Sequence, residues 1–394
     1  MTVPLTEPHD LTGAHGLAGA HDGTAYDPVD IREFVDAEIV PHADEWDQDE
    51  RLPPKILHRI GELGLWAPFL PPDAGGAAMD WTTLGRVHEE IGRGCSSVRS
   101  FLTVHTMVTW TVQRWGSDAQ RERWLPRLAA GDLIGAFCLT EPDSGSDASA
   151  SGTVAESNGS GWVINGEKKW MTAGQVAGLL LVFCRSAEGM SAFLVPADSP
   201  GVEITPITGV MGTRASMLAG IRLREVRVGP EALIGPPGWA AGTVMTGALD
   251  LGRYSVACGS VGVAQACLDA CVAYTSRRRV REGRLSELQL IRRKITDMLV
   301  SSRAARLLCA EAGRLKDADD PATIMATWVA KYHASTAASA AASDAVQIHG
   351  ANGFSADHPA ARLYRDAKVA EVIEGSTELQ QLTIATEAYR EVAR

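Results

Sequence analysis

The spacing of apolar residues changes twice along this chain of 394 residues, and that change limits the folds it can adopt. Over residues 28–133 apolar side chains recur every three to four positions, which is typical of amphipathic helices. Over residues 135–242 the apolar runs are short and broken by Gly, Pro, Asn and Ser, which indicates strands joined by tight turns. Helical spacing returns over residues 244–394. The pattern predicts an α+β multidomain fold: helices, then a small β barrel or sandwich, then a helical bundle.

The same pattern divides the chain into four parts. Residues 1–27 are rich in Gly, His, Ala and Thr without periodicity, so we expect a flexible tail there. We place an N-terminal helical domain at 28–134, a β domain at 135–243 and a C-terminal helical bundle at 244–394. Within them we predict a hairpin of strands 153–156 and 162–165, further strands 179–184, 192–195 and 221–228, and helices 246–279, 286–316 and 321–348.

Charge and cysteine content argue against several classes of protein. The 37 Lys and Arg residues against 48 Asp and Glu give a net charge of −11, which lacks the basic footprint of a nucleic-acid-binding protein. The chain does not start like a signal peptide, and we find no apolar run of the ~18 residues that a membrane span needs. The seven Cys residues form no C-x-x-C motif, so we expect neither structural disulfides nor a bound metal. We expect a cytoplasmic protein.

A loop rich in Gly and Ser follows the first predicted strand, with the sequence Cys-Leu-Thr-Glu-Pro-Asp-Ser-Gly-Ser-Asp at 138–147. Gly145, between two serines, lets backbone and hydroxyl donors approach an anionic or carbonyl-rich ligand closely. A plain turn built from Pro, Gly and Asp would explain the same residues. Both interpretations remain open at this point.

A second candidate segment reads Asn-Gly-Glu-Lys-Lys-Trp-Met-Thr at 165–172. Its Asn-Gly pair predicts a hairpin turn, after which a strand presents Trp170 and Thr172 on one face. The indole could stack on a flat heterocycle that the hydroxyl hydrogen-bonds, although a Trp packed in the core is the simpler alternative. His88 lies on an apolar helical stripe, and we interpret it as a packed histidine.

Together these segments resemble those of the acyl-CoA dehydrogenase family. The strings Thr-Glu-Pro-x-x-Gly-Ser-Asp and Asn-Gly-x-Lys-x-Trp-x-Thr occur at the spacing of that family. They are followed in order by Gln-Ile-His-Gly at 347–350, Arg-x-x-Arg-Asp at 362–366 and Ile-Glu-Gly-Ser-Thr at 373–377. The resemblance implies an N-terminal α-helical domain, a central β-barrel and a C-terminal four-helix bundle. It also implies bound FAD and a homodimer or homotetramer.

The resemblance assigns residues to the cofactor. Those implied to border the flavin and its phosphates are Phe137, Leu139, Thr140, Gly145, Ser146, Trp170, Met171 and Thr172. Those implied to reach the FAD of a neighbouring subunit are Arg278, Gln289, Gln347 and Gly350. Ser376 and Glu378 are implied to touch FAD just after the catalytic turn. For Arg362, Arg365 and Asp366 we prefer interdomain ion pairing.

Glu374 is implied to be the catalytic base, and Arg253 to belong to the substrate region. Oxidising an acyl thioester across Cα–Cβ needs a base for the weakly acidic α proton while hydride leaves Cβ for the flavin. A carboxylate is a stronger base in an apolar site, because burial raises its pKa. We expect Val372 and Ile373 to supply that apolar site, and Gly375 to leave room for the thioester.

The segment Cys-Ser-Ser-Val-Arg-Ser-Phe-Leu-Thr at 95–103 resembles that of glutaryl-CoA dehydrogenases. Its continuation is similar to dehydrogenases that process extender units of the hydroxymalonyl or methoxymalonyl type on acyl carrier proteins in polyketide antibiotic biosynthesis, and the sequence does not say which carbon is oxidised. Arg99 is expected to face the distal end of a small acyl group, with Thr103 beside it. Alternatively, Arg99 pairs with a protein carboxylate such as Glu89 or Glu90.

The expected function is FAD-dependent oxidation of a small polar or acidic acyl thioester, carried by CoA or by an acyl carrier protein. The resemblance implies an electron-transfer flavoprotein as the electron acceptor. A glutaryl-CoA-like reaction, a short-chain acyl-CoA dehydrogenase reaction and a flavin monooxygenase on the same fold are the alternatives. A monooxygenase needs no base for an α proton, so Glu374 argues against it. The complete set of motifs argues against a non-catalytic scaffold.

Overall fold

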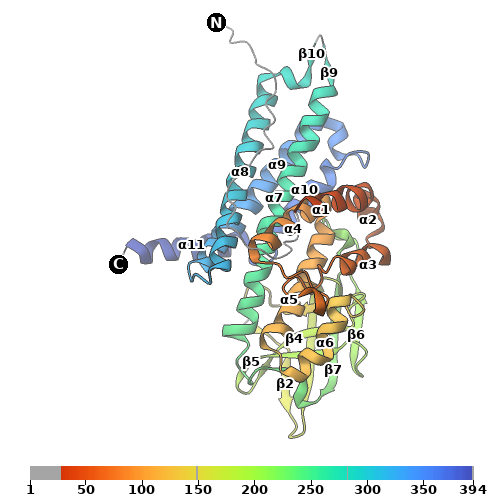
Figure 1. Ribbon diagram of the computed structural model, residues 1–394, viewed down its shortest axis with the longest axis vertical. Coiled ribbons are helices and arrows are strands. Elements are labelled where there is room, and N and C mark those ends of the chain that lie inside the picture. The colour runs from red at the N-terminus through yellow and green to blue at the C-terminus, as the bar shows by residue number, and fades with distance from the viewer. Residues whose placement is uncertain (1–27, 148–149, 282, 393–394) are drawn as a thin grey trace.

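The computed structural model describes residues 28–147, 150–281 and 283–392, and the predicted tail lies outside the described residues. In Figure 1 the strands between residues 135 and 234 occupy one end of the molecule, and the N-terminal helices lie beside its middle and partly in front of these strands. The C-terminal helices extend from the middle to the opposite end. The predicted succession of a helical domain, a β domain and a second helical domain is confirmed.

Local signals set the starts of several N-terminal helices. The main helices are α1 (Pro28–Phe34), α2 (Ala43–Asp49), α3 (Pro54–Glu62), α4 (Trp81–Gly94), α5 (Ser96–Trp115) and α6 (Asp118–Ala130). The Asp80 side chain caps α4, and Ser117 forms a capping box with Gln120 at the start of α6. Helix α5 is buried along most of its length, so it carries Arg99 and Thr103 into the centre of the molecule.

The β domain is a single eight-stranded sheet. Its strands are β1 (Gly135–Cys138), β2 (Val154–Ser157), β3 (Trp162–Met171), β4 (Leu179–Ser186), β5 (Gly189–Pro196), β6 (Val202–Pro206), β7 (Ala219–Val228) and β8 (Leu233–Ile234). The hydrogen-bonded path runs β6–β7–β3–β2–β4–β5–β8, and β1 pairs with β4 in parallel. The predicted hairpin is confirmed, because β2 and β3 pair antiparallel with Ser157 opposite Trp162.

The hairpin turn predicted at Asn165-Gly166 is wrong, because both residues lie inside β3. The register of β3 against β7 shifts between Ile164 and Gly166, so the pair forms a bulge. Gly166 has a φ of +151°, and a Cβ there would lie 2.5 Å from Thr153 Oγ1. Glycine is needed for this close approach, not for a turn.

The C-terminal helices form a bundle around α7, which packs against α4, α8 and α9. The elements are α7 (Thr246–Arg277), the short hairpin β9 (Arg279–Val280) and β10 (Gly283–Arg284), α8 (Gln289–Asp317), α9 (Thr323–His349), α10 (Ala360–Val372) and α11 (Thr377–Val392). Many residues of α7 and α9 are Ala, Gly or Ser, and their small side chains allow the helices to pack closely.

One helical segment, Ala241–Arg277, is long and apolar enough to cross a membrane by length and composition, with a window of mean hydropathy 1.6. The expectation that the sequence holds no such run is therefore corrected. Of that window 67% is buried inside the protein. Its apolar character is explained by its place at the centre of the bundle.

Charged residues of α10 join the three parts of the molecule. The ion pairs between α10 and α2 are Arg362–Asp44 and Arg365–Asp47. Asp366 accepts a hydrogen bond from Thr213 N, in the segment between β6 and β7, over 2.6 Å. The interpretation of these α10 residues as interdomain contacts is confirmed. They fix the first half of α10, the helix that leads into the Glu374 turn.

Candidate active site

The turn between α10 and α11 holds Glu374 in a backbone conformation that few residues adopt. Glu374 has a φ of +57°, and the following Gly375 has a φ of +94°. A left-handed conformation costs a residue other than glycine roughly 1–2 kcal/mol. It persists only where the surrounding structure holds it in place.

Three side chains from three helices hold the two carbonyl groups of this turn. Lys331 Nζ, on α9, donates to Gly375 O over 2.8 Å, and Gln380 Nε2, on α11, donates to the same oxygen over 2.9 Å. Arg253 Nε, on α7, donates to Glu374 O over 3.2 Å. The turn is therefore positioned from the bundle on several sides, which fixes the direction of the Glu374 side chain.

The Glu374 carboxylate lies in a buried and positively charged environment. Its Oε2 is buried and has no hydrogen-bond partner among the described residues. A Cβ on Gly252 of α7 would lie 2.5 Å from this oxygen, so a larger residue there would displace the carboxylate. Burial raises the pKa of Glu374 to about 7, although the charges of Arg253, Lys331 and Arg99 lower it. Near neutral pH the carboxylate can both accept and release a proton.

The apolar setting expected from Val372 is wrong. Its side chain is 60% exposed, and Ile373 is only half-buried. The carboxylate is buried because the turn packs onto α7, beside Gly252. This contact joins residues far apart in the chain, so the residues next to Glu374 could not reveal it.

Arg99 brings a positive charge into the same region from α5. Its side chain is buried, with 4% of the residue exposed, and Nη1 donates to Thr103 Oγ1 over 3.3 Å. Burial lowers the pKa of Arg99 to about 10, while the charges of Glu374 and Asp366 raise it. The guanidinium therefore stays charged at neutral pH.

The alternative that Arg99 pairs with Glu89 or Glu90 is wrong. Glu89 forms an ion pair with Arg306 at 2.7 Å, and Glu90 forms one with Arg93 at 2.7 Å. In the part of the chain that the structure describes, Arg99 has no ion pair, and Thr103 is its only side-chain partner. Its guanidinium keeps N–H donors for a ligand.

The residues predicted to face the flavin gather where β1 and β3 end. Lys169 N donates to Thr140 O over 2.9 Å, which joins the segment after β1 to the end of β3. A bulge near the end of β3 gives Trp170 a φ of +69° and leaves its indole 48% exposed, whereas Met171 is buried. The Thr172 hydroxyl has no hydrogen-bond partner among the described residues. An exposed ring and a hydroxyl without a described partner thus lie two positions apart in the sequence, on either side of the buried Met171.

The loop after β1 leaves backbone donors open. Phe137 on β1 is buried and Leu139 is half-buried. A Cβ on Gly145 would meet no atom within 4 Å, and neither Gly145 nor Ser146 forms a hydrogen bond within the described ranges. Free N–H groups in an open Gly-Ser loop suit the oxygens of a phosphate.

A buried ion pair, which sequence reasoning missed, fixes this loop. Glu141 Oε1 lies 2.7 Å from Lys168 Nζ of β3 and also accepts from Ser151 Oγ and Thr153 N. Burial alone would raise the pKa of Glu141, but these donors hold it at about 2. The Glu of the Thr-Glu-Pro string thus ties the loop to β3 instead of facing a ligand.

The residues predicted to reach a neighbouring subunit lie at the opposite end of the bundle, near the β9–β10 hairpin (Figure 1). They are Arg278, Gln289, Gln347 and Gly350, all of them exposed. At this end Tyr274 of α7 stacks on His349 of α9, with ring centroids 4.3 Å apart. A single chain does not bring this group to the residues at the ends of β1 and β3.

Ser376 and Glu378 lie at the start of α11, directly after the Glu374 turn. Ser376 Oγ accepts from Leu379 N over 3.4 Å, and Glu378 is exposed. Their contact with a cofactor stays a prediction.

Comparison with known proteins decides the family. Residues 29–132, 136–226 and 238–389 match the N-terminal, middle and C-terminal domains of acyl-CoA dehydrogenases. The chain belongs to the acyl-CoA dehydrogenase family. It is therefore an FAD-dependent oxidoreductase that acts on a CH–CH group.

Individual relatives cover nearly the whole chain. The short-chain specific acyl-CoA dehydrogenase of rat mitochondria is 38% identical over 360 residues, or 90% of this chain and 87% of the relative. A glutaryl-CoA dehydrogenase from Mycobacterium smegmatis, solved with FADH2, has a TM-score of 0.87 and 31% identity, covering 92% of this chain and 93% of the other. FkbI, described as acting in the biosynthesis of the methoxymalonyl extender unit of a polyketide, has a TM-score of 0.84 and 33% identity, covering 92% and 99%.

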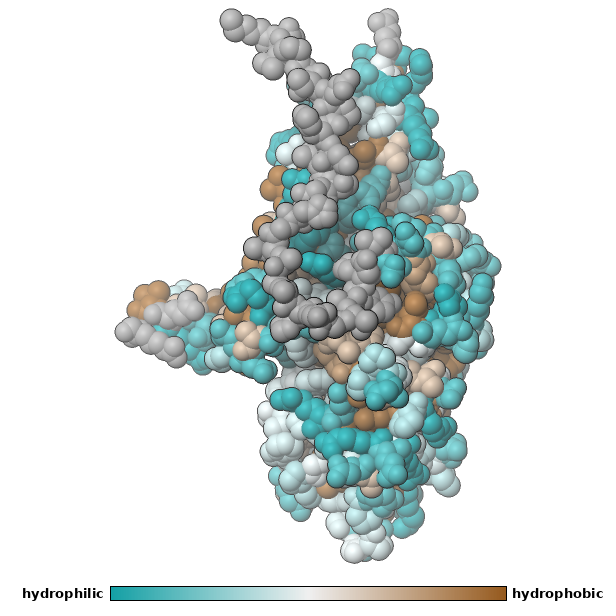
Figure 2. All heavy atoms as spheres, in the orientation of Figure 1, coloured by the Kyte–Doolittle hydropathy of each residue, from teal (hydrophilic) through white to brown (hydrophobic). Residues whose placement is uncertain are grey.

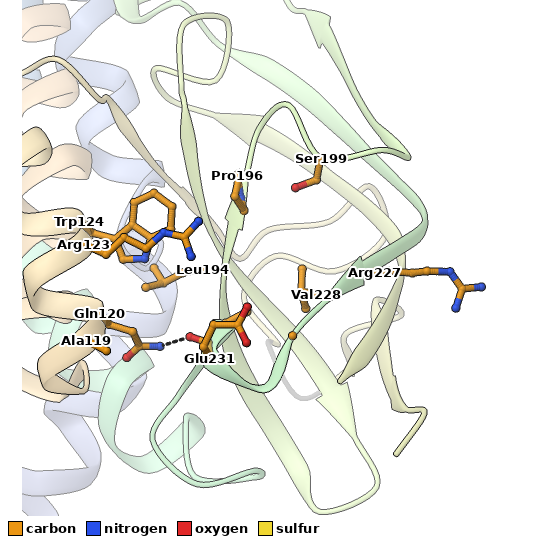
Figure 3. A pocket seen from close by; sticks show the side chains of 12 residues that line it. Ala119, Gln120, Arg123, Trp124, Leu194, Pro196, Ser199, Arg227, Val228 and Glu231 are labelled. Carbon is orange, nitrogen blue, oxygen red and sulfur yellow. Dashed lines mark hydrogen bonds between the residues drawn. The ribbon is translucent and has the colours of Figure 1, made fainter. Parts of the chain in front are cut away.

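The residues at the ends of β1 and β3 fit the FAD of this acyl-CoA dehydrogenase. The exposed Trp170 indole and the free Thr172 hydroxyl suit a flat heterocycle, and the donors of Gly145 and Ser146 suit phosphate. A separate cavity of about 250 Å³ between α6 and the β domain (Figure 3) contains none of the predicted site residues. One wall of that cavity is fixed by Gln120 Nε2, which donates to Glu231 O over 2.7 Å.

Sequence reasoning missed Lys331 although one signal was available. Apart from Lys331 and Asp344, helix α9 carries no Asp, Glu, Lys or Arg, and Lys331 is fully buried. A single lysine on the buried face of an Ala-rich helix needs a polar partner, which here is the Gly375 carbonyl.

Proposed function

We propose that this enzyme oxidises a small acidic or polar acyl thioester across Cα–Cβ, with Glu374 as the base. The observation that carries the proposal is the buried, charged Arg99, which forms no ion pair with a carboxylate of the described residues although the charges of Glu374 and Asp366 act on it. A buried charge without a partner is costly, and a guanidinium can bind a substrate carboxylate with two parallel hydrogen bonds. A long fatty acyl chain would leave the charge of Arg99 unmatched, so it should be a poor substrate.

The residues around the base suit this reaction. Glu374 takes the α proton, and the electron pair of that C–H bond forms the Cα=Cβ double bond as hydride leaves Cβ. Bound FAD supplies the two-electron acceptor for that hydride. Arg253 and Lys331 hold the turn that carries the carboxylate, so the base is positioned before the substrate binds.

We further propose a hydroxylated precursor of an extender unit, held as a thioester on a carrier protein, as the physiological substrate. On such a substrate Glu374 would take the hydroxyl proton, the C–O bond would become C=O, and hydride would leave the carbon that bears the hydroxyl for the flavin. The likeness to FkbI supports it, at 33% identity over 92% of this chain. A glutaryl-CoA-like reaction is the second candidate, supported by the likeness to glutaryl-CoA dehydrogenase, and Arg99 would serve both. That reaction would also release the distal carboxylate, so measuring CO2 during turnover separates the two.

Two partners complete the proposal. We propose a homodimer or homotetramer, because the residues predicted to reach FAD lie in two groups at opposite ends of the bundle. An electron-transfer flavoprotein is the proposed acceptor that reoxidises the flavin.

Anaerobic flavin bleaching with a panel of thioesters tests the function. The panel holds glutaryl-, 3-hydroxypropionyl-, butyryl- and octanoyl-CoA, together with the same acyl groups on a carrier protein. We expect a yellow protein with one FAD per chain, and the fastest bleaching by the acidic or hydroxylated thioesters. Fast bleaching by octanoyl-CoA with none by the acidic thioesters would contradict the proposal. Oxygen uptake without bleaching would favour a monooxygenase.

A further inference from the structure

Behind Arg99, a line of buried polar side chains runs from α5 across α7 to α4. Thr103 Oγ1 lies 2.5 Å from Ser255 Oγ of α7, and Ser255 Oγ lies 3.1 Å from His88 Nδ1 of α4. The exposed fractions of Thr103, Ser255 and His88 are 2%, 0% and 0%. His88 was interpreted as a packed histidine, and it is packed, but it also ends a hydrogen-bonded chain that begins at Arg99.

The direction of each hydrogen bond in this chain follows from its first member. Thr103 Oγ1 lies 2.7 Å from Arg99 O, which can only accept, so the single hydroxyl proton of Thr103 is used there. Ser255 must then donate to Thr103, and His88 must donate to Ser255 from a protonated Nδ1. Thr103 is left with a lone pair that accepts from Arg99 Nη1. The chain thus keeps Thr103 an acceptor toward the guanidinium.

The surroundings of His88 keep it neutral, as this arrangement requires. Burial, together with the charge of Arg99, lowers the pKa of His88 to about 3. Its Nε2 has no partner among the described residues, which suits a bare lone pair better than an N–H.

Gly259 of α7 positions Arg99 from a second side. A Cβ at this position would lie 2.8 Å from Arg99 Cδ, 3.0 Å from Nε and 3.1 Å from Cγ. The aliphatic part of the Arg99 side chain can therefore lie against α7 because position 259 has no side chain that would collide with it. Gly252, seven positions earlier on the same helix, leaves room for Glu374 in the same way.

We propose that Ser255, His88 and Gly259 are positioning residues that hold the Arg99 guanidinium toward the acyl pocket and so determine the preference for an acidic acyl group. This inference rests on the proposed function. None of the three residues needs to touch the substrate. They act through Thr103 and through the stem of Arg99.

Steady-state kinetics of the FAD-loaded enzyme test the proposal with glutaryl-CoA and butyryl-CoA as probes. Ser255→Ala should lower kcat/KM for glutaryl-CoA roughly five- to tenfold through KM, with butyryl-CoA little changed, as expected for one lost hydrogen bond. Gly259→Ala should lower it further. Ser260→Ala is the matched control, because Ser260 is also buried on α7 and, among the described residues, its hydroxyl bonds Val256 O of its own helix alone. It should leave both substrates unchanged.

A double variant distinguishes an effect through the hydrogen bonds of Thr103, Ser255 and His88 from a general effect on packing. In a Thr103→Val background, Ser255→Ala should have no further effect, because the chain is already broken at Thr103. The proposal would be overturned if Ser255→Ala lowered kcat/KM equally for glutaryl-CoA and butyryl-CoA. It would also be overturned if the effects of Thr103→Val and Ser255→Ala on kcat/KM were fully additive. A wild type that does not prefer glutaryl-CoA over butyryl-CoA would instead overturn the proposed function.

The tautomer of His88 gives a readout that needs no substrate. Nitrogen-15 NMR of selectively labelled histidine, with His88→Asn to assign the signal, should show a proton on Nδ1 that does not titrate between pH 5 and 8. Ser255→Ala should shift this signal, and Ser260→Ala should not. A proton on Nε2 of His88, or a His88 signal that Ser255→Ala does not change, would contradict the proposed hydrogen bonds from His88 through Ser255 to Thr103. This result would not depend on which substrate the enzyme uses.

Discussion

At the scale of single residues, the proposed reaction depends on the protonation of Glu374. Burial raises its pKa to about 7, and the base must be ionised to take the α proton. The rate of anaerobic flavin reduction should therefore rise about tenfold per pH unit below pH 7 and level off above it. Stopped-flow reduction from pH 5.5 to 8.5 checks this. Glu374→Gln should keep FAD bound but abolish the rise, and a Gln variant that reduces flavin at the wild-type rate would place the base elsewhere.

Lys331 should affect the pKa of Glu374 in addition to holding the turn that carries this residue. Its charge lowers the pKa of Glu374, so Lys331→Met should move the pH profile of flavin reduction to higher pH by about one unit. Lys331→Arg keeps the charge and should move it less. A profile that stays in place in Lys331→Met, with FAD still bound, would limit Lys331 to a structural role.

At the scale of helices and strands, periodicity predicted most elements, and contacts between distant segments account for the errors. Strands β4, β5 and β7 and helices α7, α8 and α9 lie close to their predicted ranges. The pair Asn165-Gly166 is typical of a hairpin turn, but the same two residue types also suit a β-bulge. Here Gly166 is needed because Thr153 of a neighbouring segment comes close to it. The sequence motifs identified Glu374 and Arg99, but they did not identify Lys331 or Ser255. The roles of these two residues depend on contacts between distant segments, where α7 and α9 meet α5 and the end of α10.

His105 joins three elements and gives a stability test. Its Nε2 lies 3.0 Å from Leu128 O at the end of α6, and its Nδ1 accepts from Gly135 N at the start of β1 over 3.1 Å. His105→Leu should lower the free energy of unfolding by roughly 1–3 kcal/mol, because the buried Gly135 N loses its acceptor and Leu128 O keeps, among the described residues, only Gly131 N as a donor. Chemical denaturation at pH 7.5 measures this.

The pH dependence of the same histidine has a definite sign. Burial lowers the pKa of His105 from 6.5 to about 4. Between these values the unfolded chain binds a proton that the native protein does not, so stability falls as pH drops from 6.5 toward 4. In His105→Leu this fall should be shallower, and an unchanged slope would show that His105 is already protonated in the native protein.

At the scale of the whole molecule, one chain leaves apolar surface uncovered. Helix α11 stands away from the body of the molecule in Figures 1 and 2, and Leu382, Tyr389 and Val392 on it are 69%, 80% and 89% exposed. We expect a dimer or tetramer by light scattering, with lower mass in Leu382→Glu. Thr386→Glu, at an exposed polar position of the same helix, should keep the wild-type mass. A monomeric wild type would contradict this expectation.

We propose that Arg99 selects an acidic acyl group for oxidation at Glu374, and a ratio of two flavin-reduction rate constants measures this selection. The measurement is the rate constant of anaerobic flavin reduction at subsaturating thioester, for glutaryl-CoA relative to butyryl-CoA, in the wild type and in Arg99→Met. The account predicts a ratio well above one in the wild type that falls roughly a hundredfold in Arg99→Met, because one partner of a buried charge pair is lost. A ratio that is the same in both proteins would contradict it.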